Sequence, residues 1–459
     1  MPSIVIIGAG PAGVRAAEAL VDAGLRPTVI DEAPASGGQI YRRPPPAIRR
    51  DPKELYGFEA ARAADQHRTF DGLRGKIDYR ANTVVWSAHE RSLSIVTDAG
   101  PKELPWDRLI LATGAMDRII PFQGWTLPGV YTLGGAQVAL KYQACAVGER
   151  PVFLGTGPLL YLVAYQYAAA GVDVGAVLDT ASFSAKGRAL PGLLRGGRTF
   201  LKGLGSVLRL RSRGVRLAFG VRPIAAVAGS DGSVSELLWR DQRGREQRTT
   251  CDALATGFGL RSETQLADLC GIPFAFDSVQ RQWLPVQDSD GRAAVAGIYL
   301  AGDGAAVRGA EAAALSGARA AHALLYDLGR RESARETEAL NRQLDRFERF
   351  RKALETGAFP FPAHLAAEAA DDLVICRCEA VTAGELRHST RKLGAIEINR
   401  AKAFSRLGMG RCQGRICGPA AAEILADAIG VPLEAVGRLR GQAPVKPVPM
   451  ATFLEGAAS

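Results

Sequence analysis

A glycine-rich turn close to the N-terminus constrains the fold more than any other feature of the sequence. Residues 3–8 are apolar enough to form a buried strand, and the turn that follows carries Gly8, Gly10 and Gly13 ahead of a helical pattern. In such a turn the first glycine permits a tight bend, the second lets a pyrophosphate approach the backbone, and the third lets the helix pack closely on the strand. The next predicted strand ends in Asp31, where a carboxylate accepts ribose hydroxyls. The sequence therefore predicts a βαβ unit that binds a dinucleotide.

Two later segments have the form expected of the same domain. An apolar run from residue 108 ends in Thr113 and Gly114, and a run from residue 297 ends in Gly302 and Asp303 ahead of an alanine-rich helix. These segments resemble those of flavoprotein reductases with two dinucleotide domains, which bind FAD. The resemblance implies that Asp303 binds the ribityl chain of FAD and that the following helix aims its N-terminus at the cofactor. The FAD contacts expected from the motifs and the resemblance are Gly8, Gly10, Pro11, Ala12, Gly13, Asp31, Glu32, Gly38, Gln39, Thr113, Gly114, Gly302 and Asp303.

A second strand, glycine turn and helix begin at residue 151. Gly155 and Gly157 occupy the first two glycine positions, Leu160 occupies the third, and the next strand ends in Asp179. A bulky third residue pushes the helix away from the strand, and no arginine directly follows Asp179 to bind a 2′-phosphate. This domain is expected either to bind NAD(H), or to keep the fold while it binds another nucleotide such as ATP, or none.

The seven cysteines fall into two groups. Cys145, Cys251 and Cys270 stand alone, so each is expected to be a buried small hydrophobe. No Cys-x-x-Cys pair lies near either glycine turn, which disfavours disulfide reductase chemistry. The other cysteines form one Cys-x-Cys pair and one Cys-x4-Cys pair near the C-terminus: Cys376, Cys378, Cys412 and Cys417.

The two C-terminal cysteine pairs suit a soft metal or an iron–sulfur cluster. Glycines beside them let backbone amides turn toward the sulfurs, and zinc is the generic alternative for four cysteines. Their surroundings, Cys-Arg-Cys-Glu and Gly-Met-Gly-Arg-Cys-Gln-Gly-Arg-Ile-Cys, resemble the bacterioferritin-associated-ferredoxin type of 2Fe-2S domain. The resemblance implies that all four cysteines bind a 2Fe-2S cluster rather than zinc.

These patterns predict an α/β fold with two Rossmann-like domains, like a flavoprotein disulfide reductase without its redox disulfide, plus a small, mainly helical 2Fe-2S domain. A charged helical stretch and a Phe-Pro-Phe-Pro break separate the last domain from the others. The expected boundaries are an FAD-binding domain at 1–119 and 251–330, an inserted second dinucleotide-binding-like domain at 120–250, a helical linker at 331–370, the 2Fe-2S domain at 371–440 and a C-terminal tail at 441–459.

Nearly the whole chain resembles one family. The domain order, together with Gly-Gly-Gln-Ile-Tyr-Arg-Arg-Pro from Gly37, Gly-Gly-Ala-Gln from Gly134 and Pro-Val-Lys-Pro-Val-Pro from Pro444, is similar to the alpha subunits of heteromeric amino acid dehydrogenases. These include opine (octopine and nopaline) oxidases, D-hydroxyproline dehydrogenase, dye-linked proline dehydrogenases and hydrogen cyanide synthase. The resemblance implies an oxidoreductase acting on CH–NH donors, as one subunit of a complex.

The same resemblance implies the partners and further cofactors. It predicts a beta subunit, similar to D-amino-acid oxidase, that oxidises the C–N bond at its own flavin, and a small 2Fe-2S gamma subunit. It also predicts FMN where the alpha and beta subunits meet, and an electron acceptor such as a quinone. The chain itself shows no set of residues arranged to bind an amine and act on it as acid and base, so no catalytic residue is assigned and a relay of electrons is expected.

Two other functions remain open from the sequence. A self-sufficient NAD(P)H-dependent FAD/2Fe-2S reductase would need an intact second nucleotide site, against which Leu160 counts. An iron–sulfur sensor or scaffold without enzymatic activity would need no flavin, against which the complete first glycine turn counts.

The net charge of +10 comes mostly from one stretch of the chain. Ten Lys and Arg residues and no acidic residue lie between Asp179 and Asp231. This stretch is expected to be an ordinary solvated face, a surface for an acidic partner, for anionic lipid or for a nucleotide phosphate, or the docking surface for the beta partner. Aromatic residues do not alternate with the basic ones as in nucleic-acid-binding motifs, so nucleic acid is not an expected partner. No secretory signal follows Met1, which predicts a cytoplasmic protein, or a peripheral one at the inner face of the membrane.

Overall fold

The first dinucleotide domain is built on a parallel sheet in the computed structural model, which describes residues 2–454 except the side chains of residues 198, 199 and 454. The strand order is β20-β7-β1-β2-β3, and every pair is parallel. Buried apolar runs make these strands, because a parallel sheet is covered on both faces. The strands are β1 (Ile4–Ile7), β2 (Thr28–Ile30), β3 (Asp78–Arg80), β7 (Arg108–Leu111) and β20 (Ile298–Leu300).

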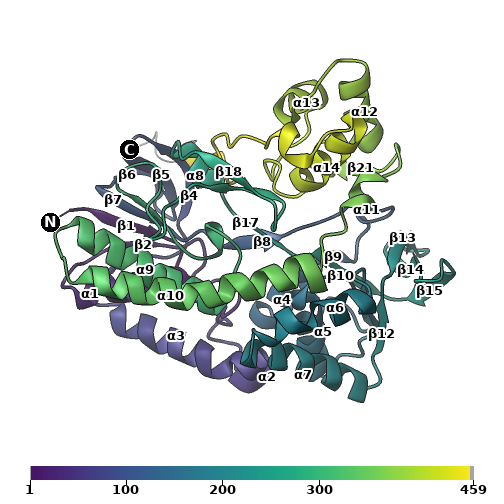
Figure 1. Cartoon of the computed structure of the whole chain (residues 1–459), viewed down its shortest axis with the longest axis horizontal. Helices are drawn as coiled ribbons and strands as arrows, with labels where there is room; N and C mark the ends of the chain where they lie inside the picture. Colours follow the sequence, from purple (N-terminus) through teal and green to yellow (C-terminus); the bar gives the residue numbers. More distant parts are fainter. Residues whose placement is uncertain (1, 455–459) are drawn as a thin grey trace.

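Helices and a small antiparallel sheet cover the two faces of this sheet. One face packs on helices whose alanines allow close contact, and the other packs on the sheet β4-β5-β6. Figure 1 shows the helical layer beside the sheet. The covering elements are α1 (Pro11–Asp22), α3 (Ala60–Leu73), α9 (Ala310–Asp327), β4 (Val84–His89), β5 (Ser92–Thr97) and β6 (Gly100–Pro105), and the short α2 (Pro52–Tyr56) and η1 (Gly57–Glu59) precede α3.

The second domain repeats the parallel design. Its strand order is β12-β11-β10-β16-β9, with the antiparallel sheet β13-β14-β15 beside it. The strands are β9 (Val130–Thr132), β10 (Pro151–Thr156), β11 (Ala176–Asp179), β12 (Arg216–Phe219), β13 (Arg222–Ala228), β14 (Val234–Arg240), β15 (Glu246–Thr250) and β16 (Ala253–Phe258). The helices are α4 (Leu133–Tyr142), α5 (Pro158–Ala169), α6 (Phe183–Leu194) and α7 (Arg198–Ser212).

One expected boundary differs from the structure. The sequence predicts a return to the FAD-binding domain at residue 251, but β16 pairs with β10 along its whole length and therefore belongs to the second sheet. The chain returns to the first domain through β17 (Leu260–Ser262), which pairs with β8 (Ala115–Asp117). The reason is that a buried apolar strand carries no local mark of the sheet that it joins.

The segment expected as a linker packs along the first domain. Helix α10 (Ser333–Lys352) lies beside α9 and continues as a π-helix, η3 (Ala353–Ala358), before α11 (Ala363–Ala367) (Figure 1). Between β7 and β20 the first domain also carries α8 (Gln265–Leu269), β18 (Phe274–Asp277) and β19 (Gln282–Pro285), and η2 (Gly302–Gly304) follows β20.

The C-terminal domain is mainly helical, as expected. A Thr382 and Glu385 capping box starts its first helix, and the last long helix begins at Cys417. Its elements are β21 (Val374–Cys376), β22 (Val381–Thr382), α12 (Ala383–Arg391), α13 (Ile398–Ser405), α14 (Cys417–Ile429) and η4 (Leu433–Val436), followed by α15 (Ala451–Leu454) in the tail. Figure 1 shows this domain above the second domain. Its apolar core is continuous with that of the second domain in one cluster of buried residues.

No helix in the described part of the chain is both long and apolar enough to cross a bilayer.

Candidate flavin and iron–sulfur sites

The first glycine turn has the geometry that a pyrophosphate needs. Gly8 has φ of 104°, which favours glycine, and a Cβ on Gly13 would lie 1.7 Å from the Gly8 carbonyl oxygen. Gly38 lies against Gly10, because a Cβ on Gly10 would be 3.6 Å from the Gly38 Cα. No side chain caps the start of α1, so its first N–H groups are free for an anion. Four of the expected FAD contacts therefore form one cradle.

Asp31 stands at the end of β2, beside this cradle. Its Oδ2 accepts a hydrogen bond of 2.6 Å from the Ala9 N–H and its Oδ1 one of 2.7 Å from the Ala33 N–H. Burial raises the pKa of Asp31, against these two hydrogen bonds. The neighbouring Glu32 forms an ion pair of 2.9 Å with Lys446. The C-terminal tail thus reaches the first nucleotide site, a contact that the sequence did not predict.

The two later turns meet at the opposite edge of the cradle. A Cβ on Gly304 would lie 2.5 Å from the Thr113 Oγ1, so the turns at residues 113 and 303 touch. Asp303 Oδ1 accepts hydrogen bonds from the backbone N–H groups of Arg308 and Gly309, at 2.8 and 3.1 Å. Burial raises the pKa of Asp303. The carboxylate is therefore held in place by backbone groups, ready to accept a hydroxyl of the ribityl chain.

The remaining expected contacts frame the same place. Gly302 donates its N–H to the Ser316 Oγ at 2.7 Å, and a Cβ on Gly302 would lie 2.8 Å from the Ala12 Cβ. Gln39 lies in the loop after Gly38 and accepts a hydrogen bond from Arg42 at 3.2 Å. These positions, together with the uncapped helix and the glycine cradle, fit FAD.

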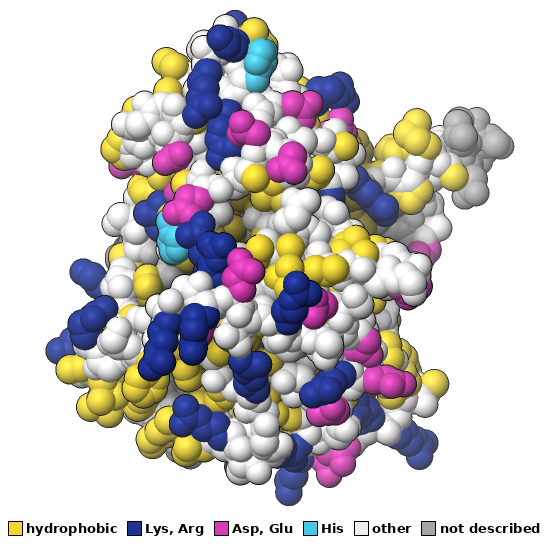
Figure 2. All heavy atoms as spheres, turned by 90° about the vertical axis from the view of Figure 1, so that its right-hand side faces the viewer, with side chains coloured by type: hydrophobic (Ala, Val, Ile, Leu, Met, Phe, Trp, Pro, Cys, Tyr) yellow, Lys and Arg dark blue, Asp and Glu magenta, His cyan; other side chains and the backbone are white. Residues whose placement is uncertain are grey.

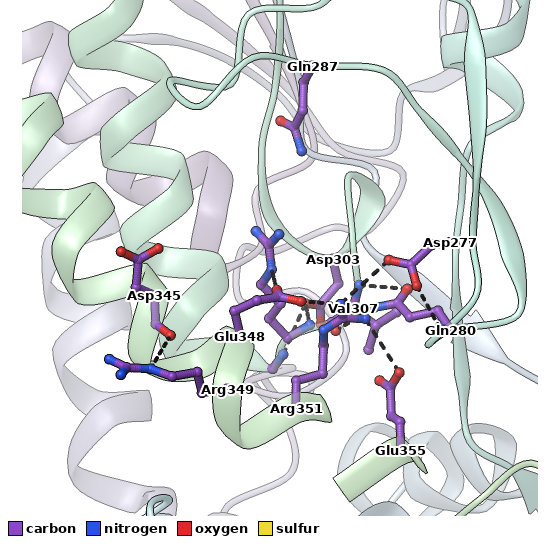
Figure 3. Close-up of polar contacts among 12 residues, drawn as sticks. Asp277, Gln280, Gln287, Asp303, Val307, Asp345, Glu348, Arg349, Arg351 and Glu355 are labelled. Atoms are coloured by element: carbon purple, nitrogen blue, oxygen red, sulfur yellow. Dashed lines mark hydrogen bonds and ion pairs between the residues drawn. The ribbon is translucent and has the colours of Figure 1, made fainter. Parts of the chain in front are cut away.

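Figure 3 shows that side chains of the helix expected as a linker, among them Glu348 and Arg351, lie close to the turn at Asp303 and to Asp277. Arg308, which follows the Asp303 turn, donates from Nε to the Glu348 Oε2 of α10 at 3.0 Å. Arg351 pairs with Glu348 and lies 3.5 Å from Asp277. Burial raises the pKa of Glu355, at the start of the π-helix, to about 7. Because these residues are spread over charged helical sequence, no motif marked them as part of a site.

The second glycine turn has the backbone conformation of a nucleotide-binding turn, but the carboxylate that would accept from a ribose is not free. Gly155 and Gly157 have φ of 146° and 105°, while Leu160 is fully buried in the core of the domain. Asp179, at the end of β11, is 0% exposed. Its carboxylate accepts from the Tyr161 hydroxyl, from the Ala181 N–H at 2.8 Å and from Lys186 at 2.7 Å. The group that would bind a ribose is therefore buried and already bonded to three protein donors.

The four C-terminal cysteines come together between β21 and α14. The Cys417 thiol donates hydrogen bonds to the sulfurs of Cys376 and Cys412, which lower the pKa of Cys376 to about 6 and that of Cys412 to about 5. The same two bonds raise the pKa of Cys417. Burial raises the pKa of Cys378, whose sulfur contacts Cys412. Two of the four sulfurs are thus poised as thiolates, the form that binds iron.

Backbone amides surround these sulfurs. Gly408 and Glu379 donate N–H groups to the Cys376 sulfur, and Gly414 and Ile416 to that of Cys412. Such N–H···S bonds are typical of iron–sulfur sites and tune their potential. The donor set, two short-spaced pairs of cysteines with backbone N–H groups directed at their sulfurs, has the chemistry that a two-iron cluster takes.

Glu263 connects the flavin turn to the cysteine loop. It donates its N–H to the Gly114 carbonyl at 3.0 Å and accepts from the Thr113 hydroxyl at its own carbonyl at 2.6 Å. Its carboxylate accepts from the Arg415 Nε at 2.6 Å. Burial alone would raise the pKa of Glu263, but the Arg415 cation lowers it below the usual value. Nothing in the sequence marked this residue.

Two further hydrogen bonds cross the same boundary. Arg261 donates from Nη1 to the Arg415 carbonyl at 3.1 Å, and Gln265 donates from Nε2 to the Gln413 carbonyl at 2.7 Å. The loop that carries Cys412 is therefore fixed to the first domain by side chains of residues 261–265.

The lone cysteines are only partly as expected. Cys251 is buried and Cys270 is half-buried, but Cys145 is exposed, so its assignment as a buried hydrophobe is wrong. It follows the end of α4, next to Ala144 with φ of 54°, where the chain turns away from the core.

Comparisons with known proteins agree with this architecture. Residues 2–323 match the family described as pyridine nucleotide-disulphide oxidoreductase, which implies FAD. Residues 374–427 match the BFD-like [2Fe-2S] binding domain, which implies a 2Fe-2S cluster.

Relatives match along the whole chain. The A subunit of opine oxidase from Agrobacterium tumefaciens (strain Ach5) is 37% identical over 98% of this chain and 90% of its own length. Hydrogen cyanide synthase subunit HcnB of Pseudomonas aeruginosa is 34% identical over 98% of this chain and 97% of its own length.

Solved structures show the same fold. The L-proline dehydrogenase from P. horikoshii superposes with a TM-score of 0.69 at 21% identity, covering 98% of this chain and 79% of that one. Thioredoxin reductase of T. acidophilum superposes with a TM-score of 0.52 at 19% identity, over 71% of this chain and 98% of that one. The chain belongs to the pyridine nucleotide-disulphide oxidoreductase family, together with the A subunit of opine oxidase and the HcnB subunit of hydrogen cyanide synthase, and carries a BFD-like 2Fe-2S domain.

Proposed function

We propose that this chain is the electron-transfer subunit of a heteromeric dehydrogenase that oxidises the C–N bond of an amino acid or an opine on a partner subunit. When bound, FAD accepts electron pairs and the 2Fe-2S cluster carries single electrons. The residues of this chain would hold both groups at a fixed separation. The two electrons released for each oxidised C–N bond leave for an acceptor such as a quinone, which takes up two.

The observation that carries the proposal is the Glu263 bridge. Thr113 and Gly114, the proposed flavin contacts, bond to its backbone, and Arg415 of the cysteine loop bonds to its carboxylate. One residue therefore orients both sites. Electron transfer slows steeply with distance, so a short, rigid connection of this kind favours a relay between the two groups.

The enclosed Asp179 favours a donor other than NAD(P)H. Its carboxylate is held by Tyr161, Ala181 and Lys186, so binding of a nicotinamide ribose there would require the buried ion pair to break. This counts against a self-sufficient NAD(P)H-dependent reductase.

The proposal that this chain is part of a complex rests on the names of its relatives. Two of them are named as subunits, one of an oxidase and the other of a synthase, which supports a heteromeric complex. We propose that the partners are a D-amino-acid-oxidase-like beta subunit, with FMN where it meets this alpha chain, and a small 2Fe-2S gamma subunit. ATP or another nucleotide would be the ligand of the second domain if that domain binds one.

An anaerobic titration tests the direction of electron entry. The purified chain, loaded with FAD and cluster, is mixed with NADH or NADPH while the visible flavin absorbance is followed, and dithionite serves as the positive control. We expect dithionite to bleach the flavin and neither nicotinamide to do so. Rapid bleaching by NADH or NADPH would replace the proposal with the reductase function.

The complex is then tested with substrate. The chain and its candidate beta subunit are co-expressed, purified together and mixed anaerobically with opines, proline or hydroxyproline. Electron paramagnetic resonance should show a reduced cluster in the complex and none in the isolated chain. A cluster that stays oxidised with every amine, in a complex whose beta flavin is reduced, would contradict the relay.

A further inference from the structure

Helix α7 turns an apolar stripe to the solvent. Leu201, Leu204 and Leu208 are spaced by three and four residues, which places them on one face of the helix. Their exposed fractions are 61%, 44% and 56%. Leu210 packs inward and is fully buried, and Lys202 pairs with Glu59 of the first domain at 2.7 Å. The helix is thus apolar on its outer face as well as on its inner one, unlike an ordinary surface helix, whose outer face is polar.

Helix α6 has a matching stripe. Phe183, Leu190 and Leu194 are spaced by seven and four residues and are 63%, 44% and 60% exposed. Together the two helices hold six of the fourteen strongly exposed large hydrophobic side chains in the described part of the molecule. Isolated exposed leucines are ordinary, but a patch of this kind marks a surface that binds something.

Unpaired basic residues surround the stripes. Arg188, Arg195, Arg211 and Arg213 are exposed, and none has a carboxylate within 4 Å among the described residues. The chain between Asp179 and Asp231 contains no acidic residue that could neutralise them. Figure 2 views the molecule from the right-hand side of Figure 1. At its lower left, hydrophobic side chains and Lys and Arg side chains lie next to one another, with few Asp and Glu among them.

We propose that α6 and α7 form a membrane-binding surface that lies on an anionic lipid bilayer. The leucines and Phe183 would enter the boundary between headgroups and acyl chains, and the arginines would contact lipid phosphates, as in interfacial amphipathic helices. This role goes beyond the proposed function and stands independently of the electron donor. It would place the chain where a lipid-soluble electron acceptor is found.

Charge favours a bilayer over a protein partner. Arginines stand within one or two turns of the exposed leucines along both helices. A protein partner would have to place carboxylates among its apolar contacts to neutralise them, and Asp and Glu are depleted at the cores of protein interfaces. An anionic bilayer offers apolar chains and a dense sheet of negative charge at the same depth, and so matches both features at once.

Vesicle co-sedimentation of the full-length holoprotein tests the proposal. Vesicles of phosphatidylcholine mixed with phosphatidylglycerol are compared with vesicles of phosphatidylcholine alone, at low and high salt. We expect binding to the anionic vesicles, weakened by salt. The combined Leu201→Ser, Leu204→Ser and Leu208→Ser variant should bind them at least about tenfold more weakly, because it removes apolar area from the inserted face.

Matched controls separate the surface from general effects. The combined Leu393→Ser and Ile396→Ser variant removes exposed apolar side chains from the 2Fe-2S domain and should bind like the wild type. Replacing the four unpaired arginines with glutamine should abolish the preference for anionic lipid. Thermal unfolding and FAD content report whether each variant is folded.

Three outcomes would overturn the proposal. They are no binding to either kind of vesicle, equal binding by the leucine variant and the wild type, and loss of a co-purifying beta subunit in the leucine variant without any vesicle binding. The last outcome would reassign α6 and α7 to a protein interface.

Discussion

The two dinucleotide domains of this chain start from the same design and differ at two positions. Both have a parallel strand, a glycine turn and a helix without a side-chain cap. The first has Gly13 where the second has Leu160, and Asp31 is only partly enclosed where Asp179 is sealed by Tyr161, Ala181 and Lys186. The fold survives both changes, while the carboxylate at the end of the second strand becomes enclosed by protein donors. The glycine turn therefore indicates the fold, whereas the contacts of the carboxylate after the second strand indicate whether a ribose can bind there.

Gly13 should be the position in this comparison where a substitution affects cofactor binding most. A Cβ there would lie 1.7 Å from the Gly8 carbonyl oxygen, which is backbone and cannot move aside. We expect Gly13→Ala to lose FAD completely and to destabilise the fold by about 3 kcal/mol. The FAD-to-protein ratio from absorbance and the free energy of unfolding in urea measure the two effects.

Gly72→Ala in α3 is the matched control, because nothing lies within 4 Å of a Cβ at that position. It should keep FAD and be neutral or slightly stabilising. Full FAD occupancy in Gly13→Ala would show that the cradle is not the binding site.

The reverse change in the second domain should cost stability without creating a site. Leu160→Gly removes a fully buried side chain and places glycine inside α5, at a cost of about 4 kcal/mol. NADH should still fail to bleach the flavin, because Lys186 continues to hold Asp179. Chemical denaturation and an anaerobic NADH titration check the two parts. Flavin reduction by NADH in this variant would mean that Leu160 alone had closed the site.

Lys141 lies where the two domains meet and should give a smaller, pH-dependent effect. It donates from α4 to the Ile40 carbonyl at 2.9 Å, and burial lowers its pKa to about 7. Between pH 7 and the ordinary lysine pKa of about 10.4, the unfolded chain binds more protons than the folded one. Its contribution to stability therefore rises with pH through this range. Lys141→Met should be more stable than the wild type by about 2 kcal/mol at pH 7, and the difference should shrink toward pH 10.

Urea denaturation at several pH values measures this difference. The exposed Lys76 provides the control, since Lys76→Met should leave the slope of stability against pH unchanged. A variant at Lys141 with the wild-type slope would show that this lysine is charged in the folded protein.

The smallest expected effect concerns the contact between the cysteine loop and residues 261–265. These residues follow the second sheet and return the chain to the first domain. Glu263→Gln removes a negative charge and Arg415→Gln a positive one, from a pair 2.6 Å apart beside the cysteines. The potential of the cluster should therefore rise in the first variant and fall in the second, each by up to a tenfold change in the redox equilibrium, or about 59 mV for one electron.

Potentiometry followed by electron paramagnetic resonance reads these shifts. Arg411→Gln, an exposed charge in the same loop, should move the potential much less because solvent screens it. Shifts of the same sign in both main variants would indicate loosening of the loop instead of an electrostatic effect.

Local patterns predicted the parts of this molecule that depend on neighbours in sequence. The turn at Gly8, the strands before Thr113 and Asp303, and the short cysteine pairs each combine a motif with its own flanking strand or helix. The structure brings these segments together, with Gly304 against Thr113 and Gly38 against Gly10. Their roles as FAD and cluster ligands remain predictions.

Contacts between distant segments were not predictable in the same way. Glu263 follows a strand with no motif, and its importance comes from Thr113 and Arg415, about 150 residues away on either side. β16 was assigned to the wrong sheet because its apolar run would suit either one. Cys145 was expected to be buried, since a lone cysteine gives no sign of where a helix will end.

The continuous core of the second domain and the 2Fe-2S domain has a consequence for how the protein matures. Part of the second domain's interior, including Val152, Leu154 and Leu254, shares one apolar cluster with buried residues of the 2Fe-2S domain such as Leu373 and Val436, so each domain covers apolar side chains of the other. The position of the cluster domain on the second domain is therefore set during folding and does not depend on two proteins meeting in solution. The second domain, whose carboxylate Asp179 is enclosed, thus has a structural role, because the 2Fe-2S domain packs on it.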